Sequence, residues 1–248
     1  MSPLPPDTRP AIRQGLMVGF ATGLYGTSFG ALAVAAGLDV WQAVALSALL
    51  FSGGSQFALI GVIASGGAGA AAVAASTLLG LRNGFYGVQM ARMLKPRGVQ
   101  RAVAAQLTID ESTAVALSQP TPERQRAGFW ATGWAVFVFW NAMTLAGALL
   151  GNALGDPKVW GLDAAAAGAF LALLWPRLAT RAARVVATGA AAVALLATPW
   201  VPPGIPILLT ALVAVAAGMR PRMAAMGEAA ATTMAGDSAD ATQRQARP

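Results

Sequence analysis

Apolar runs of membrane-spanning length recur along most of the chain, separated by short polar or basic segments. A helix of about 20 residues crosses a hydrocarbon core of roughly 30 Å, so each such run is a candidate span. The pattern therefore predicts an all-α polytopic membrane protein with about seven transmembrane helices. The predicted spans are 15–37, 41–65, 68–91, 127–150, 162–176, 180–198 and 204–219.

The same pattern divides the chain into consecutive segments. It predicts an N-terminal polar segment at 1–14, a first membrane repeat at 15–97 and an amphipathic connector at 98–126. A second membrane repeat with the final helix follows at 127–219. The tail at 220–248 lacks Leu, Ile, Val and aromatic residues. A tail of this composition cannot bury a core, so we expect it to be disordered.

Composition narrows the classes of function. Only 11% of the residues are charged, against roughly 25% in a soluble domain. The chain contains neither His nor Cys, which are the ligands of most zinc, copper and iron–sulfur sites. We therefore expect no metal and no cofactor. We also expect no enzyme activity and no catalytic residues, because no nucleophile is paired with a base.

Basic residues set an expected orientation. The net charge of +7 is spread over the loops rather than gathered in one patch, so we expect a lipid bilayer and no nucleic acid as partner. The N-out, C-in orientation leaves only Arg9, Arg13 and Lys158 outside. The reverse orientation suits Arg9 and Arg13 but misplaces the basic cluster after the third span. The inner residues are Arg92, Lys95, Arg97, Arg101, Arg124, Arg126, Arg177, Arg181, Arg184, Arg220 and Arg222.

The two halves of the membrane region resemble each other. The Gly-Leu-Asp triplet at 37–39 is repeated at 161–163, an offset of about 124 residues. This offset pairs spans one to three with spans four to six. An odd number of spans in each repeat places the halves in opposite orientations, so the pattern predicts a three-plus-three inverted repeat.

Two interruptions occur at positions matched by this offset. Residues 81–87, LRNGFYG, interrupt the third span, and residues 198–204, TPWVPPG, interrupt the second half. Broken helices at matched positions are typical of midplane binding sites in transporters. Two alternatives stay open: the prolines at 198–204 can form a surface loop, and Arg82 can snorkel toward the inner surface beside Arg92.

A third polar interruption lies in the second predicted span. Residues 51–57, FSGGSQF, place glycines, serines and an amide among bulky apolar residues. Because backbone groups must be satisfied within lipid, Gly53, Gly54 and Ser55 predict a helix break that lines a cavity, with Gln56 facing that cavity. Helix packing through small residues is the open alternative.

Polar residues in apolar surroundings suggest a site for a zwitterion. An aliphatic amino acid requires donors for its carboxylate, oxygen acceptors for its ammonium and an apolar pocket. The N–H groups at 53–56 and Arg82 are candidates for the carboxylate, and Phe57 and Leu59 for the aliphatic tail. Asn83 and Asn141 are further polar candidates, although Asn141 also suits a helix-to-helix hydrogen bond.

Two adjacent acids lie in the connector. Asp110 and Glu111 project about 100° apart on a helix, so one can face a cavity while the other faces water or Arg82. A desolvated carboxylate can carry a proton, and both residues are candidates for proton coupling. An interfacial helix with both acids in headgroup water is the alternative.

The segments 26–63, 81–87 and 106–112 together resemble the AzlC-type branched-chain amino-acid permease family. The resemblance covers about residues 15–219 and implies a multi-spanning bacterial inner-membrane protein. It also implies export of branched-chain amino acids beside a small AzlD-type membrane partner. Gly80 and Asn83 depart from the family pattern, which weakens the inference on substrate. The matching positions are Phe29, Gly30, Gly37, Leu38, Phe51, Gly54, Gln56, Phe57, Arg82, Asp110 and Glu111.

These observations predict a secondary transporter that exports branched-chain or other small aliphatic amino acids and is coupled to protons. The principal alternative is a membrane scaffold or assembly subunit that transports nothing. In that case the glycines serve only helix packing and Arg82 only snorkels.

Overall fold

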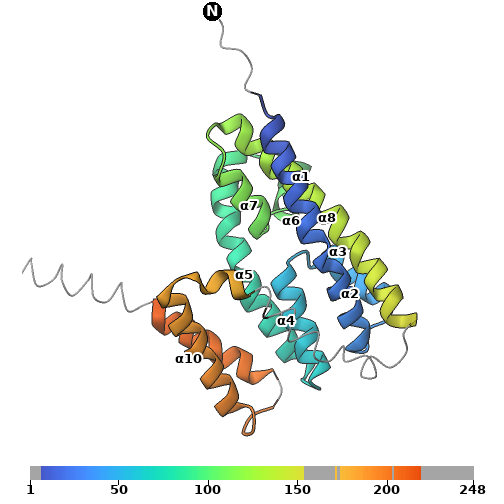
Figure 1. Ribbon diagram of the computed structural model, residues 1–248, viewed down its shortest axis with the longest axis vertical. Coiled ribbons are helices and arrows are strands. Elements are labelled where there is room, and N and C mark those ends of the chain that lie inside the picture. Colours follow the sequence, from blue (N-terminus) through green and yellow to red (C-terminus); the bar gives the residue numbers. More distant parts are fainter. Residues whose placement is uncertain (1–6, 154–170, 172–173, 203, 219–248) are drawn as a thin grey trace, which may run out of the picture. The chain divides into compact units, whose positions relative to one another are not determined.

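The computed structural model describes residues 7–153, 171, 174–202 and 204–218, and every regular element among them is helical (Figure 1). This confirms the predicted all-α class. The chain forms two compact units, Met1–Pro176 and Arg177–Pro248, which are described separately. The helices of the first unit are α1 (Arg9–Gly23), α2 (Tyr25–Ala35), α3 (Val40–Leu49), α4 (Gly53–Ala64), α5 (Gly69–Leu94), α6 (Val99–Gln106), α7 (Asp110–Leu117) and α8 (Pro122–Ala153).

Two helical stretches in the described residues are long and apolar enough to cross a membrane. The first, Arg9–Ala35, consists of α1 and α2 and contains most of the predicted span 15–37. The second is α8, which contains the predicted span 127–150. Pro122 is its first residue, a position where the missing N–H of proline has no cost. The other five predicted spans are not confirmed by this criterion of helix length and apolar composition.

The first long stretch packs along α8 in a parallel direction. A Cβ on Gly15 would meet Thr132, one on Gly23 would meet Phe139, and one on Gly30 would meet Thr144 and Ala148. The contacts thus move toward the C-terminal ends of α1–α2 and of α8 in step, which shows that the two stretches are parallel. Small residues at regular spacing allow the two backbones to approach closely.

This direction contradicts part of the predicted repeat. A three-plus-three inverted repeat requires the first and fourth spans to be antiparallel, but α1–α2 and α8 are parallel. The physical reason lies in the intervening chain, where the second predicted span reverses direction instead of continuing. The second Gly-Leu-Asp triplet, at 161–163, lies outside the described residues.

The segment predicted as the span 41–65 is a hairpin of two short helices, α3 and α4. The helical hydrogen bonding stops at Leu50–Ser52, and Gln56 Nε2 donates to the Ser47 carbonyl oxygen across the hairpin at 3.1 Å. At its start, Asp39 caps α3 by accepting a hydrogen bond from the Gln42 N–H at 2.8 Å. The prediction of a break near Gly53 is thus correct within three residues. The chain reverses direction at this break, however, whereas the prediction was a broken helix that crosses the membrane once.

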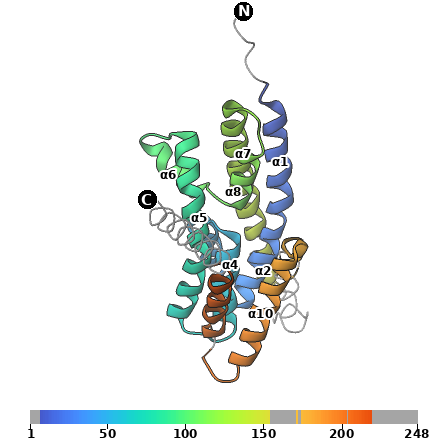
Figure 2. The same ribbon diagram turned by 90° about the vertical axis from the view of Figure 1, so that its left-hand side faces the viewer.

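The third predicted span is the single helix α5, 26 residues long. It has no interruption at 81–87, so the predicted break there is wrong. The segment contains glycines but no proline, and glycine within a helix costs only about 1 kcal/mol. Helix α5 is antiparallel to α4, and the two lie side by side (Figures 1 and 2).

The connector after α5 turns back toward the middle of this helix. Helices α6 and α7 are both short, and α7 packs against the first half of α8, where Gly133 contacts Leu107 and Gly128 contacts Val115. Residues 107–109 therefore form the tip of a second reversal of the chain, between α6 and α7. The first reversal is the α3–α4 hairpin, with its tip at residues 50–52. The two reversals approach α8 at neighbouring positions, since Phe51 packs on Phe137 with ring centroids 5.1 Å apart.

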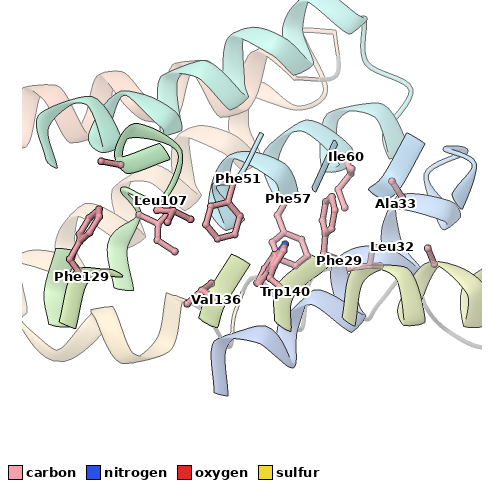
Figure 3. Packing of buried hydrophobic residues seen from close by; sticks show 14 of the residues in the cluster. Phe29, Leu32, Ala33, Phe51, Phe57, Ile60, Leu107, Phe129, Val136 and Trp140 are labelled. Carbon is pink, nitrogen blue, oxygen red and sulfur yellow. The ribbon is translucent and has the colours of Figure 1, made fainter. Parts of the chain in front are cut away.

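The core of the first unit lies between α2, α4 and α8. Phe29 packs edge to face on Phe57 at 5.6 Å between ring centroids and stacks on Trp140 at 6.2 Å (Figure 3). All three side chains are buried. Aromatic pairs of this geometry contribute about 0.5–1.5 kcal/mol each beyond their buried area, so they fix the position of the α3–α4 hairpin.

The basic residues of the first unit gather at one end. The start of α1, the start of α8 and the end of α5 lie together there (Figure 1). Arg124 Nε donates to the Asp7 carbonyl oxygen at 2.8 Å, which joins the segments before α1 and α8. The predicted placement of Arg9 and Arg13 on the face opposite Arg92 and Arg124 is therefore wrong, because the α3–α4 hairpin adds no crossing.

In the second unit, α10 (Arg181–Ala197) is followed by a helix at Ile205–Gly218. A short 3-10 helix, η2 (Trp175–Ala179), spans the boundary between the two units and precedes α10. These helices correspond to the predicted spans 180–198 and 204–219. The described residues of 198–204 form turns between them, as the surface-loop alternative expects. Most of the predicted span 162–176 and all of the tail at 220–248 lie outside the described residues.

Candidate functional site

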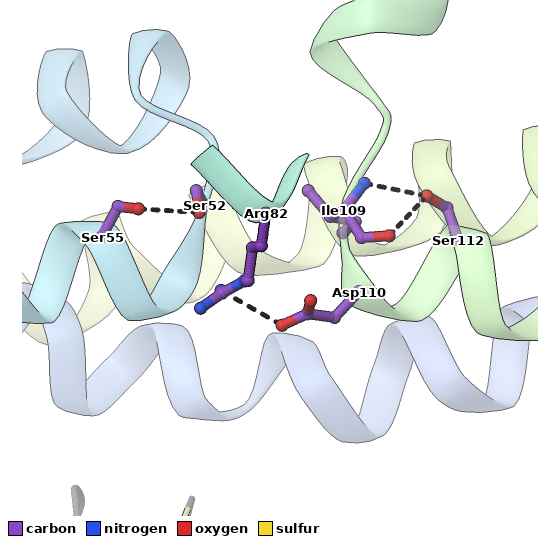
Figure 4. Close-up of polar contacts among 6 residues, drawn as sticks. All are labelled: Ser52, Ser55, Arg82, Ile109, Asp110 and Ser112. Carbon is purple, nitrogen blue, oxygen red and sulfur yellow. Dashed lines mark hydrogen bonds and ion pairs between the residues drawn. The ribbon is translucent and has the colours of Figure 1, made fainter. Parts of the chain in front are cut away.

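The tips of the two reversals meet at Arg82, near the middle of α5. Its guanidinium Nη2 lies 3.1 Å from Asp110 Oδ2 (Figure 4). The side chain of Arg82 is 30% exposed and that of Asp110 is 20% exposed. The arginine is thus paired near the middle of its helix instead of snorkelling to the end beside Arg92.

The start of α4 lies directly against this guanidinium. A Cβ on Gly54 would be 3.0 Å from Arg82 Nη1 and 3.1 Å from Nη2, so only glycine leaves the side chain its present position. Gln56 N donates to the Ser52 carbonyl oxygen as the first bond of the helix. The preceding N–H groups, at 53–55, have no intrahelical acceptor, and no side chain caps this end.

Asp110 is the first residue of α7, and the turn before it is fixed by Ser112. The Ile109 N–H donates to Ser112 Oγ at 3.1 Å (Figure 4). Ser112 Oγ in turn donates to the Leu107 carbonyl oxygen at 2.6 Å. Gln106 Nε2 also donates to the Ala48 carbonyl oxygen at 2.7 Å. This bond joins the two hairpin tips directly and so fixes the carboxylate beside α5.

The arrangement offers hydrogen-bond donors to an anion. Arg82 Nε is buried and has no acceptor, and the free N–H groups of α4 begin beside it. A guanidinium can bind a carboxylate through two parallel hydrogen bonds, and a helix N-terminus adds a favourable dipole. The site can therefore hold a carboxylate in addition to, or in place of, that of Asp110.

A cavity of about 430 Å³, lined by both polar and apolar side chains, lies between the same two tips and α5. The predicted residues Ser55 and Asn83 line it. Ser76 Oγ and Asn83 Oδ1 are buried there without a hydrogen-bond partner. The other polar side chains of the lining are Ser52, Thr77, Gln106 and Thr108.

Several of these lining residues were missed by sequence analysis. Ser76 and Gly80 precede the predicted Asn83 by seven and three residues, which places all three on one face of a helix. This spacing can be seen in the sequence. It indicates a shared face only if residues 76–83 form one continuous helix, whereas the sequence analysis expected a break at 81–87. Gln106 and Thr108 carried no comparable signal, because their position depends on the path of the connector.

Six predicted substrate residues are not part of this lining: Gly53, Gly54, Gln56, Phe57, Arg82 and Asn141. Gln56 is fully buried within the α3–α4 hairpin, and Phe57, 1% exposed, belongs to the core. Asn141 Nδ2 donates to the Phe137 carbonyl oxygen of its own helix at 2.7 Å, so the predicted helix-to-helix bond is not formed by this donor. Gly53 contacts the Trp140 ring, and Glu111 is half-buried in the first turn of α7.

The comparison with known families identifies the chain. The family model described as AzlC protein matches residues 17–154, more than half of the 248 residues. The chain belongs to the AzlC family. No curated protein and no solved structure matches it.

Membership of the AzlC family bears on the function of this site. The matched residues 17–154 include both hairpins, Arg82 and Asp110. Together with the apolar helices, the AzlC family assigns the chain to membrane proteins with a role related to amino-acid transport. This confirms the resemblance inferred from the sequence motifs.

Proposed function

We propose that this AzlC protein is a secondary transporter that exports branched-chain or other small aliphatic amino acids. The observation that supports the proposal is the Arg82–Asp110 ion pair between two hairpin tips. Ionisable residues within an apolar bundle are costly, and they commonly mark a substrate or ion pathway. No catalytic step is proposed for the site.

The substrate carboxylate is proposed to bind the guanidinium of Arg82 and the free N–H groups at 53–55. The adjoining cavity would receive the rest of the molecule, since Leu49, Leu50 and Leu81 contribute apolar surface and Asn83 an oxygen acceptor. A volume of about 430 Å³ lies within the range of small-molecule sites, roughly 300–1,000 Å³.

Proton coupling belongs to the same proposal. Asp110 and Glu111 stand in the first turn of α7, beside the pathway. A carboxylate that changes its surroundings during transport can take up and release a proton. Either acid is a candidate carrier, and a variant that transports leucine without proton movement would identify it.

The proposed setting is the bacterial inner membrane, with a small AzlD-type subunit as partner. The proposal counts α5, which is 26 residues long, as a third crossing element beside α1–α2 and α8. The basic end of the first unit then faces the cytoplasm under the positive-inside rule. The N-terminus is then cytoplasmic, in place of the N-out orientation expected from the sequence. The α3–α4 hairpin enters from the outside and the connector from the inside.

Counterflow of labelled leucine in liposomes tests the proposed function against the scaffold alternative. Purified protein is reconstituted with and without the AzlD-type partner, and liposomes are loaded with leucine, isoleucine, valine or alanine. A transporter accumulates label transiently when loaded with its substrate. A scaffold shows no accumulation in either preparation, and that result would reject export by this chain.

A further inference from the structure

A ligand that separates the side chains of Arg82 and Asp110 must compensate the charge of each. The two groups are 3.1 Å apart and both are mostly buried. In such surroundings, removing one partner leaves the other charge uncompensated, which is strongly unfavourable. A ligand that separates the two side chains must therefore supply a negative group to Arg82 and a positive group to Asp110.

An α-amino acid carries both groups on one carbon atom. Resting on the proposed function, we infer that the substrate inserts between Arg82 and Asp110, with its carboxylate on Arg82 and its ammonium on Asp110. The site is then neutral with and without substrate. Asp110 thus binds the ammonium, and Glu111 is the acid that remains for proton coupling.

The groups around Arg82 and around Asp110 fit the binding of the carboxylate by Arg82 and of the ammonium by Asp110. On the Arg82 side, the unpaired Nε–H and the free N–H groups at 53–55 are all donors, which suits a carboxylate. On the other side, Ser112 fixes the turn before Asp110, so its carboxylate keeps its place. Arg82 has the long flexible stem, and the missing Cβ of Gly54 leaves it room to shift.

Competition in the wild-type protein tests the inference without a mutation. Leucine counterflow is measured against unlabelled leucine, leucinamide, which lacks the carboxylate, and 4-methylpentanoate, which lacks the ammonium. Each single-charge analogue is expected to inhibit at least about tenfold more weakly than leucine, because each leaves one partner uncompensated. Inhibition by either analogue at the concentration of leucine would overturn the inference.

The substitution Asp110→Asn separates binding of the ammonium from mere positioning of Arg82. It should reduce the preference for leucine over 4-methylpentanoate by about tenfold or more, because the ammonium loses its partner and Arg82 becomes free for an anion. Glu123→Gln, at an exposed acid in the first turn of α8, is the control and should keep the preference. If Asp110→Asn weakened inhibition by leucine and by 4-methylpentanoate equally, Asp110 would only position Arg82, and the inference would fail.

These outcomes are distinct from failure of the proposed function. If wild-type protein shows no counterflow with any loaded amino acid, the transport proposal itself is rejected. If Asp110→Asn does not yield folded protein by size-exclusion chromatography, the wild-type competition series still decides the inference.

Discussion

At the scale of single residues, Arg82 could be singled out from the sequence and its partner could not. An arginine within an apolar segment is costly, which marks it as functional or snorkelling. Asp110 was one of two adjacent acids in the connector that could face Arg82. The pairing of Arg82 with Asp110 depends on how the 27 intervening residues, 83–109, fold back along α5, and no local pattern encodes that path.

Gln56, Phe57 and Asn141, which the sequence analysis placed at the substrate, lie outside the lining of the cavity at Ser55 and Asn83. Each was assigned to the substrate because polar or aromatic residues stand out in an apolar segment. In the structure, Gln56 satisfies the Ser47 carbonyl oxygen, Phe57 fills the core and Asn141 bonds its own helix. Residue type alone does not distinguish a group that satisfies buried backbone from one that faces a cavity.

Gly54 is expected to matter for transport more than for folding. Gly54→Ala would place a Cβ 3.0 Å from Arg82 Nη1, and the flexible arginine would move away at little cost in stability. Leucine counterflow should fall at least severalfold while the thermal stability in detergent stays within about 1 kcal/mol of wild type. Gly87→Ala, which has open space around its Cβ, should transport normally. Normal transport by Gly54→Ala would show that the present position of the guanidinium is not required.

At the scale of elements, hydropathy located the apolar segments but not their direction. A segment such as 41–65 has the length of a span, and average hydropathy is the same for one helix and for two half-helices. The Asp39 cap and the Ser-Gly-Gly sequence at 52–54 were the local signals for a hairpin. The same reasoning failed at 81–87, because Gly84 and Gly87 keep a helical backbone there, at a cost of only about 1 kcal/mol each.

The α2–α8 interface should be sensitive to a single methyl group. A Cβ on Gly30 would overlap the Thr144 carbonyl oxygen, which is backbone and cannot move aside. Gly30→Ala is therefore expected to lower stability by about 1–3 kcal/mol through overpacking, seen as a lower melting temperature in detergent. Gly84→Ala, with no atom near its Cβ, serves as the control. Equal melting temperatures for both variants would contradict the close parallel packing.

At the scale of the whole molecule, the parallel direction of α1–α2 and α8 changes the topology. The internal repeat and the charge count supported each other in the sequence, but both assumed that 41–65 crosses the membrane once. With a hairpin there, the start of α1, the start of α8 and the end of α5 share one end (Figure 1). One orientation therefore suits the basic residues that these helix ends carry, Arg9, Arg13, Arg92 and Arg124.

The chain has no native cysteine, so single cysteines can test this orientation. In intact cells, a membrane-impermeant maleimide should label Ala35→Cys, at the end of α2, and should not label Asp7→Cys. Both sites are exposed. Val99→Cys, which is cytoplasmic in either topology, is the control and should react only after permeabilisation. Labelling of Asp7→Cys together with protection of Ala35→Cys would restore the N-out model.

The central claim is that Arg82, between the two hairpin tips, holds the substrate carboxylate. Initial rates of leucine counterflow in matched liposomes, comparing Arg82→Ala with the surface control Arg92→Ala, test it most directly. Hydrogen bonds to a charged group contribute about 1.5–3 kcal/mol, so Arg82→Ala should transport at least about tenfold more slowly while remaining folded, and Arg92→Ala should match wild type. Wild-type counterflow by Arg82→Ala would contradict the claim and return the arginine to a structural role.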